Sequence, residues 1–125
     1  MKILFVDDDP AIRDLWKDQC EEAGLENISV LPYGFSALEA IQRMGDDIAV
    51  LVCDGELPMS WKGTPEYCIG KTVLQAAKDA GIPHRIVVSG DDGYCIRCVA
   101  EGLATETAKK EDVVALVAEI VKAGE

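Results

Sequence analysis

The sequence predicts an α/β protein in which helices cover both faces of a five-stranded, doubly wound parallel sheet with strand order 2-1-3-4-5. Short apolar runs of four to six residues alternate with helix-length amphipathic stretches, a pattern typical of β–α units on a parallel sheet. Residues 48–53 are apolar throughout, as expected of a central strand buried on both faces. Five such units joined by right-handed crossovers favour that strand order and a three-layer sandwich.

The first two strands flank a helix with a clear start signal. Residues 3–6 form the first predicted strand. Asp9 followed by Pro10 is a typical pair of N-cap and first helical residue, and we expect this helix to run to about Ala23. Residues 28–31 form the second strand.

Along the sequence, the second helix precedes the central strand and the third helix follows it. Ser36 with Glu39 three residues later predicts a capping box at the start of the second helix, which ends near Gly45. After Asp54 the periodic pattern lapses, and the third helix is expected over residues 70–81.

The last two units complete the sheet. Residues 85–88 predict the fourth strand, and residues 91–101 predict a short helix. The fifth strand is expected over residues 103–107, and a final helix over residues 111–123.

Composition and charge exclude several classes of protein. The chain of 125 residues has 12 Lys and Arg against 23 Asp and Glu, a formal charge of −11 that argues against direct nucleic-acid binding. No apolar run approaches the ~20 residues of a membrane-spanning helix, and the N-terminus lacks the pattern of a signal peptide. We therefore expect a cytoplasmic single domain over residues 1–125, without an output domain and with its five cysteines reduced.

Polar side chains gather where the predicted strands end. Ligands of such sheets bind at the carboxyl ends of the strands, beside the switch point between the first and third strands. Three carboxylates there favour a hard divalent cation such as Mg²⁺, and a carboxylate beside Mg²⁺ can act as a nucleophile toward phosphorus. A lysine and a serine there could bind phosphoryl oxygens. The residues at these strand ends are Asp7, Asp8, Asp9, Asp54, Ser89 and Lys109.

In these features the chain resembles the receiver domain of two-component response regulators, whose chemotaxis-type members have a flavodoxin-like fold. The resemblance rests on the segments 3–10, 50–54 with Leu57 and Pro58 after it, 87–90, and Gly102 seven residues before Lys109. It implies that Asp54 accepts a phosphoryl group and that Asp8 binds Mg²⁺ directly. It also implies that Asp7 acts through water or as part of the acidic pocket, that the backbone carbonyl of Glu56 is a further metal ligand, and that Ser89 and Lys109 contact the phosphoryl oxygens.

The resemblance also implies a role and partners. A sensor histidine kinase or a phosphotransfer protein would donate the phosphoryl group, and a downstream protein would bind the fourth helix, fifth strand and fifth helix. The protein would be a signalling phosphoacceptor with self-catalysed phosphotransfer and autodephosphorylation, and not an enzyme of steady turnover.

Three features depart from the family pattern. The loop after Pro58 is roughly eight residues longer than usual, over residues 59–69. The family usually has an aromatic residue three positions before the lysine, where this chain has Glu106, and it usually has a proline after the lysine, where this chain has Lys110. These departures predict intact phosphorylation chemistry with a nonstandard output.

Other functions stay open from the sequence. In a haloacid-dehalogenase-like phosphatase, Asp7 and Asp9 would be nucleophile and acid/base, although that function leaves Asp54 unused. A degenerate receiver could act as a binding module without phosphorylation. The pair Cys95 and Cys98 could form a redox or metal site, but two small apolar residues on a helix explain its spacing as well.

Overall fold

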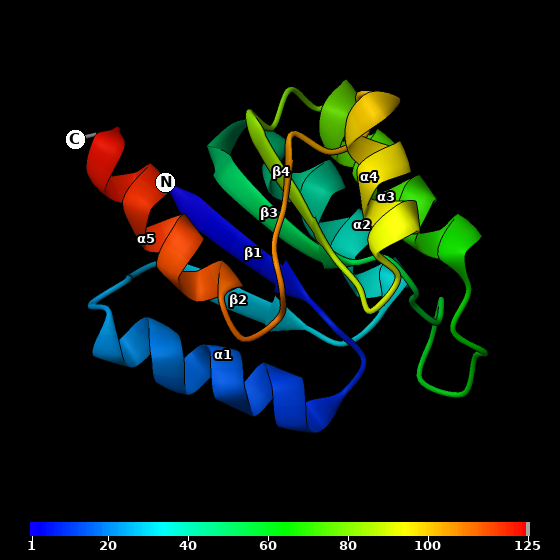
Figure 1. The fold of residues 1–125 in the computed structure, drawn as a ribbon, viewed down its shortest axis with the longest axis horizontal. Coiled ribbons are helices and arrows are strands. Elements are labelled where there is room, and N and C mark those ends of the chain that lie inside the picture. Colours follow the sequence, from blue (N-terminus) through cyan, green and yellow to red (C-terminus); the bar gives the residue numbers. More distant parts are fainter. Residues whose placement is uncertain (125) are drawn as a thin grey trace.

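The computed structural model describes residues 1–124 and confirms the predicted sheet. Five parallel strands pair in the order β2-β1-β3-β4-β5. Helices α1 and α5 cover one face of this sheet, and α2, α3 and α4 cover the other (Figure 1). The strands are β1 (Lys2–Val6), β2 (Ile28–Leu31), β3 (Ile48–Asp54), β4 (His84–Val88) and β5 (Glu106–Thr107). The helices are α1 (Pro10–Glu22), α2 (Gly34–Met44), the 3₁₀ turn η1 (Gly45–Asp47), α3 (Tyr67–Asp79), α4 (Asp92–Ala100) and α5 (Val113–Ala123).

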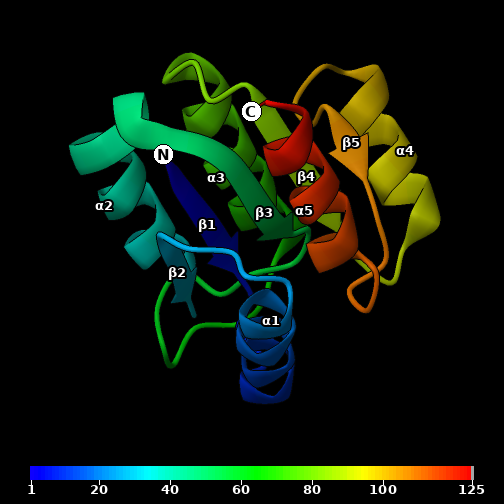
Figure 2. The ribbon, with the colours of Figure 1, turned by 90° about the vertical axis from the view of Figure 1, so that its left-hand side faces the viewer.

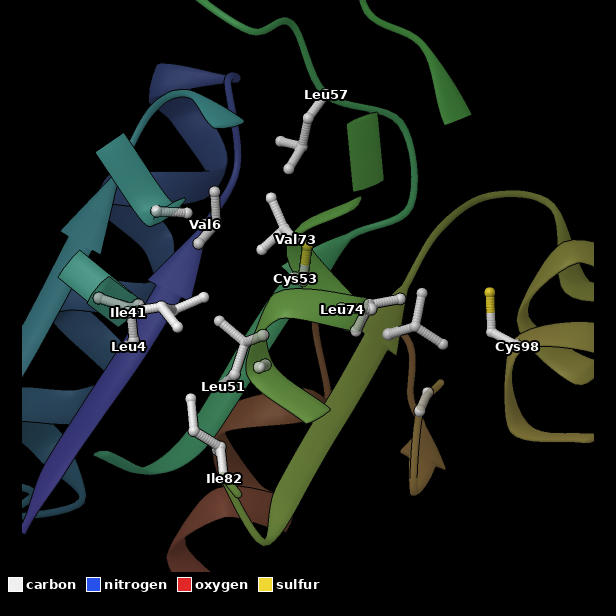
Figure 3. Close-up of a cluster of buried hydrophobic side chains, with 14 of the residues drawn as sticks. Leu4, Val6, Ile41, Leu51, Cys53, Leu57, Val73, Leu74, Ile82 and Cys98 are labelled. Atoms are coloured by element: carbon white, nitrogen blue, oxygen red, sulfur yellow. The ribbon is translucent and has the colours of Figure 1, made fainter. Parts of the chain in front are cut away.

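Each strand sends alternate side chains into two separate cores, because successive residues of a strand point to opposite faces of the sheet. Leu4, Val6 and Leu51 pack under α2 and α3 in one core, part of which Figure 3 shows. Phe5 and Val52 pack against α1 and α5 in the other. Figure 2 shows the three layers from a second direction. None of the helices among residues 1–124 combines the length and apolar character that a bilayer crossing requires.

The start of α1 agrees with its predicted capping signal. Asp9 is the N-cap, its side chain accepts a hydrogen bond from the backbone N–H of Ala11 at 2.9 Å, and Pro10 is the first helical residue. The cap is exposed at the carboxyl edge of the sheet, so it fixes the direction in which the chain leaves β1.

The predicted capping box of α2 is wrong. The helix begins at Gly34, two residues before Ser36, and its N-cap Tyr33 makes no side-chain bond. The carbonyls of Pro58 and Met59 accept hydrogen bonds from the first helical N–H groups, those of Gly34 and Phe35, both at 2.9 Å. Groups that lack an intrahelical partner are therefore satisfied by the long loop after β3, which no local signal could reveal.

The edge strand β5 is shorter than predicted, because residues 103–105 form a turn held by Arg85. The Arg85 guanidinium donates hydrogen bonds to the carbonyls of Leu103 (2.9 Å), Ile82 (2.9 Å) and Gly102 (3.1 Å). The backbone N–H of Arg85 also donates to Oγ1 of Thr105 at 2.9 Å. One side chain thus joins the ends of α3 and α4 to the start of β5.

Replacing Arg85 with Ala should destabilise the protein by about 2 kcal/mol, because three carbonyls lose a charged donor at once. Chemical denaturation followed by circular dichroism measures this loss. Arg43→Ala is the matched control, since that arginine is exposed on α2 and makes no hydrogen bond or ion pair in the described part of the chain. Equal unfolding free energies for the two variants would contradict the role given to Arg85.

Candidate functional site

An acidic cluster lies at the carboxyl edge of the sheet, where the sequence predicted it. One carboxylate oxygen from each of Asp7, Asp8 and Asp54 lies within 4.8 Å of the others. Asp7 and Asp8 directly follow β1, and Asp54 ends the neighbouring strand β3. Asp7 has no exposed surface and Asp54 is 6% exposed, so two of the three acids are buried.

The lysine of this site is Lys110 and not Lys109, which corrects the sequence prediction. Nζ of Lys110 lies 2.9 Å from Oδ2 of Asp7 and 3.1 Å from Oδ2 of Asp54. Lys109 is exposed and forms no ion pair among the described residues. A single ammonium group therefore bridges the two buried carboxylates.

The geometry of the segment after β5 explains the one-residue difference. Side chains alternate along this extended segment, so that Ala108 packs into the core beneath α1 and α5 while Thr107 and Lys109 are exposed. Lys110 therefore points to the same side as Ala108. The fully buried Trp16 fixes this arrangement, since its indole N–H donates to the carbonyl of Lys110 at 2.9 Å.

With Lys110 as the lysine of the site, the segment still lacks the aromatic residue and the proline that the receiver-domain pattern has near this lysine. The residue three positions before Lys110 is Thr107, which is no more aromatic than Glu106. Glu111 follows Lys110, and no cis peptide bond occurs within residues 1–124.

The electrostatics of the cluster favour a bound cation. Burial, and then the neighbouring Asp7 carboxylate, raise the pKa of Asp54 to about 6. The same two causes raise the pKa of Asp8. Burial alone would lower the pKa of Lys110, but its ion pairs with Asp7 and Asp54 outweigh this and raise it. With all four groups ionised, three carboxylates and one ammonium leave two uncompensated negative charges.

The donor set fits a hard divalent cation. Oxygen ligands lie about 2.1 Å from Mg²⁺, so two ligands of one ion are at most about 4.2 Å apart. The three carboxylate oxygens all lie within 4.8 Å of one another, so small side-chain movements would bring them to one ion. Oδ2 of Asp7 is buried and has no hydrogen-bond partner in the described part of the chain apart from its ion pair with Lys110. Charge, spacing and ligand type thus agree with Mg²⁺.

A cavity of about 610 Å³ opens onto the cluster, and most of the other predicted residues line it. Ser89 follows β4, and its hydroxyl accepts a hydrogen bond from the backbone N–H of Asp91 at 3.2 Å. Glu56 follows β3, and its backbone N–H donates to Oδ1 of Asp54 at 3.3 Å. The full lining is Asp8, Asp54, Glu56, Pro65, Tyr67, Ser89, Gly90, Asp91, Asp92 and Lys110.

Two residues of this site were missed by the sequence reasoning. Lys110 is one position from the predicted lysine, and the burial of Ala108 together with the hydrogen bond from Trp16 places Lys110 at the site in place of Lys109. Tyr67 lines the cavity because α3 begins at Tyr67 and not near Gly70. The helical periodicity of α3 was hidden there, because the sequence before Gly70 offers no clear start signal.

The structure weakens two of the alternatives left open by the sequence. The phosphatase alternative needs Asp9 in the site as the acid/base and gives Asp54 no role. In the structure Asp9 lies outside the acidic cluster and caps α1, whereas Asp54 lies within the cluster. Cys95 and Cys98 are both buried in the core under α4 as free thiols. Within residues 1–124, only the three aspartates form a group that could hold a metal ion through His, Cys or acidic side chains.

The sequence matches no protein-family model and no curated protein. Its fold is that of solved receiver domains. A response regulator receiver domain protein from Clostridium thermocellum superposes with a TM-score of 0.75 at 22% identity, over 98% of this chain and 95% of the other. The Legionella pneumophila response regulator LqsR superposes with a TM-score of 0.70 at 22% identity, over 98% of this chain. This chain spans 42% of the length of that regulator.

The same fold also occurs without any natural function. A de novo designed Rossmann 2x3 protein superposes with a TM-score of 0.76 at 20% identity, over 98% of this chain and 90% of the other. Similarity of fold therefore leaves the chemistry to be argued from the side chains at the carboxyl edge of the sheet.

Proposed function

We propose that this protein is a phosphoacceptor response regulator of a two-component system, in which Asp54 receives a phosphoryl group in a Mg²⁺-dependent reaction. The observation that carries the proposal is the cluster of Asp7, Asp8 and Asp54 with the ammonium group of Lys110 against two of them. Transfer of a phosphoryl group requires a nucleophile, a cation and a positive donor in one place. This edge of the sheet has carboxylates that can supply the nucleophile and the ligands of a cation, and the ammonium group of Lys110.

Asp54 is the best placed of the three acids to act as the nucleophile. Asp7 has no exposed surface. Asp8 and Asp54 both line the cavity, but of these two only Asp54 contacts Lys110 in the described part of the chain. In the transfer, a carboxylate oxygen of Asp54 forms a bond to phosphorus, and the bond from phosphorus to the donor breaks. The donor group leaves with that electron pair and takes up a proton.

The remaining residues would hold the transferred group. Lys110 can donate to one phosphoryl oxygen, replacing the ion pair that it makes with Asp54. The Ser89 hydroxyl can donate to a second. Asp8, Asp54 and the carbonyl of Glu56 would ligate Mg²⁺ directly, with Asp7 behind them. When bound, Mg²⁺ neutralises the developing charge on the phosphoryl oxygens.

The proposed partners follow from this chemistry. A sensor histidine kinase or a phosphotransfer protein would carry the phosphoryl group to the open cavity. A downstream protein would bind the face made by α4, β5 and α5, where Ile96 and Val99 expose apolar surface on α4. We propose self-catalysed transfer and hydrolysis at Asp54 in place of steady turnover.

Acetyl phosphate with Mg²⁺ should add one phosphoryl group to the protein, and Asp54→Ala should abolish the addition because it removes the attacking oxygen. Intact-protein mass spectrometry measures the adduct. The matched control is Asp9→Ala, which removes an acid from the same edge that only caps α1.

Two outcomes would contradict this function. An adduct that persists in Asp54→Ala would place the acceptor elsewhere. No adduct in the wild type would favour a binding module without phosphorylation, and continuous release of p-nitrophenol from p-nitrophenyl phosphate would favour a phosphatase.

A further inference from the structure

Two side chains of α1 hold the segment that carries Lys110. The indole N–H of Trp16 donates to the carbonyl of Lys110 at 2.9 Å, and Nε2 of Gln19 donates to the carbonyl of Glu111 at 3.1 Å. Residues three apart lie on the same face of a helix, so one face of α1 binds two consecutive carbonyls. The backbone of Lys110 is thus held by a helix that is distant in the sequence.

The elements on either side of this segment constrain it little. β5 ends at Thr107, three residues before Lys110, and the N-cap of α5, Asp112, makes no side-chain hydrogen bond. The backbone N–H of Asp112 donates to the carbonyl of Lys109 at 3.0 Å, which closes a turn around Lys110 but does not join it to the sheet. Glu111 follows Lys110, so no proline ring restricts the backbone dihedral φ there. The contacts from α1 therefore set the position of Lys110.

The same face of α1 also contacts the strand that leads to the acids. Trp16 is fully buried, and the centroid of its ring lies 5.3 Å from that of Phe5 in β1. Arg13, three residues before Trp16, donates from Nη1 to the carbonyl of Asp7 at 3.1 Å. Because one helix face holds the backbone of an acid of the cluster and the backbone of the lysine, it fixes the two relative to each other.

The side chain of Gln19 has a cost that its packing does not explain. Its Oε1 atom is buried and has no hydrogen-bond partner in the described part of the chain. An unpaired buried oxygen lowers stability, and an apolar side chain of similar size would avoid this loss. The bond from Nε2 to the Glu111 carbonyl is therefore the contribution that the amide makes at this position.

We infer that Trp16 and Gln19 are positioning residues for phosphoryl transfer, because they set where the ammonium group of Lys110 meets the phosphoryl oxygens. This inference rests on the proposed function. In transfer from acetyl phosphate, an oxygen of Asp54 forms a bond to phosphorus, and acetate leaves with the electron pair of the broken bond. Lys110 stabilises this step only if its donor lies within hydrogen-bond distance of the oxygens on which charge develops. A lysine whose backbone is free to move meets that condition less often.

Gln19→Leu tests the inference without opening the core. It removes the bond to the Glu111 carbonyl and also the unpaired oxygen, so the free energy of unfolding should not fall. The rate of adduct formation with acetyl phosphate and Mg²⁺ should fall about three- to tenfold, the value of one hydrogen bond. Mass spectrometry measures the rate, and chemical denaturation in EDTA measures the stability. Gln75→Leu is the matched control, because Gln75 donates to Asp79 within α3 and does not line the cavity.

Two further substitutions at this position distinguish positioning from a general structural effect. Gln19→Glu keeps the shape of the side chain, but its carboxylate cannot donate to the Glu111 carbonyl, so the reaction should be as slow as in Gln19→Leu. Gln19→Lys retains a donor and should restore most of the wild-type rate. Asp18→Asn makes the same change in net charge as Gln19→Lys at an exposed position of α1, so it measures any effect of charge alone.

Trp16→Phe removes the donor that binds the Lys110 carbonyl directly and keeps an aromatic ring against Phe5. We expect this variant to react about tenfold more slowly than the wild type, or slower still. Trp61→Phe is its matched control, because Trp61 is 70% exposed and is not part of the cavity wall. If Trp16→Phe does not fold, the variants of Gln19 decide.

The outcomes separate this inference from the function beneath it. A wild-type rate in Gln19→Leu overturns the inference, whatever Trp16→Phe does, and leaves phosphorylation of Asp54 in place. A rate in Gln19→Lys as low as that of Gln19→Leu, or equal slowing by Gln75→Leu, also overturns it. A fall in the stability of Gln19→Leu that accounts for its slower reaction would assign the effect to the fold and overturn it as well. A wild-type protein that takes up no phosphoryl group overturns both the inference and the function.

Discussion

Lys110→Ala should abolish measurable phosphorylation at short times and destabilise the metal-free protein, whereas Lys109→Ala should do neither. Nζ of Lys110 is the cation nearest to both buried carboxylates, and it is the donor available to a phosphoryl oxygen. Removing one donor of this kind typically slows a reaction by about 10²–10³-fold. Initial rates of adduct formation with acetyl phosphate measure this effect.

The loss of stability has a separate cause. Without Lys110, the fully buried carboxylate of Asp7 loses its cationic partner, and an uncompensated buried charge costs about 3–5 kcal/mol. The Lys110 side chain is 27% exposed, so we expect the lower end of this range, about 3 kcal/mol, in denaturation with a chelator present. Lys109→Ala makes the same change in net charge at an exposed position. Equal losses in the two variants would show that Lys110 does not stabilise the cluster.

The parts of the fold that the sequence predicted well are those set by local pattern. The apolar run 48–53 predicted a central strand buried on both faces, and this strand is the centre of the sheet. Asp9 and Pro10 start α1 as predicted, because capping is an interaction between neighbours. The acidic cluster was predictable for a related reason, since parallel strands bring their carboxyl ends to one edge.

The parts predicted wrongly depend on contacts between distant residues. The start of α2 is set by carbonyls of the loop after β3, and the start of β5 by hydrogen bonds from Arg85 to the carbonyls of Leu103 and Gly102. Lys110 replaces Lys109 because Trp16, in α1, holds its carbonyl. In each case a polar group from another element decides between adjacent positions, and sequence periodicity carries no information about such a choice.

Asp54→Asn should make the metal-free protein more stable at pH 7. The pKa of Asp54 in the folded state is about 6, against a usual value of 3.8. Ionised Asp54 therefore costs the folded state about 3 kcal/mol at pH 7, since each pKa unit corresponds to about 1.4 kcal/mol. Asn removes this cost but also the hydrogen bond to Lys110, so we expect a net gain of about 2 kcal/mol in chemical denaturation with EDTA.

The pH dependence of the gain identifies its origin. Because the folded-state pKa is raised, the wild type loses stability relative to the variant as pH rises from about 4 to about 6, and the difference stays constant above that. At pH 5 folded Asp54 is largely protonated, so the cost of ionising it falls to about half of its value at pH 7, and the net gain should fall to about a third. Asp18→Asn is the control, because it makes the same change in net charge on the exposed side of α1. A gain of equal size in Asp18→Asn, or one that does not change with pH, would assign the effect to net charge alone.

Mg²⁺ should make the wild type more stable than Asp54→Asn, the reverse of their order without the ion. Asp54 contributes a charged oxygen to the proposed metal site, so Asn at this position should weaken binding of the ion, while the wild type gains stability from it. At a Mg²⁺ concentration 100 times the Kd, the wild type should gain about 2.7 kcal/mol, which exceeds the advantage of about 2 kcal/mol that Asp54→Asn has without the ion. Melting curves with and without Mg²⁺ measure both proteins under identical conditions. If Mg²⁺ stabilised wild type and Asp54→Asn equally, its binding site would not include Asp54, and the acidic cluster would be a feature of the apo fold only.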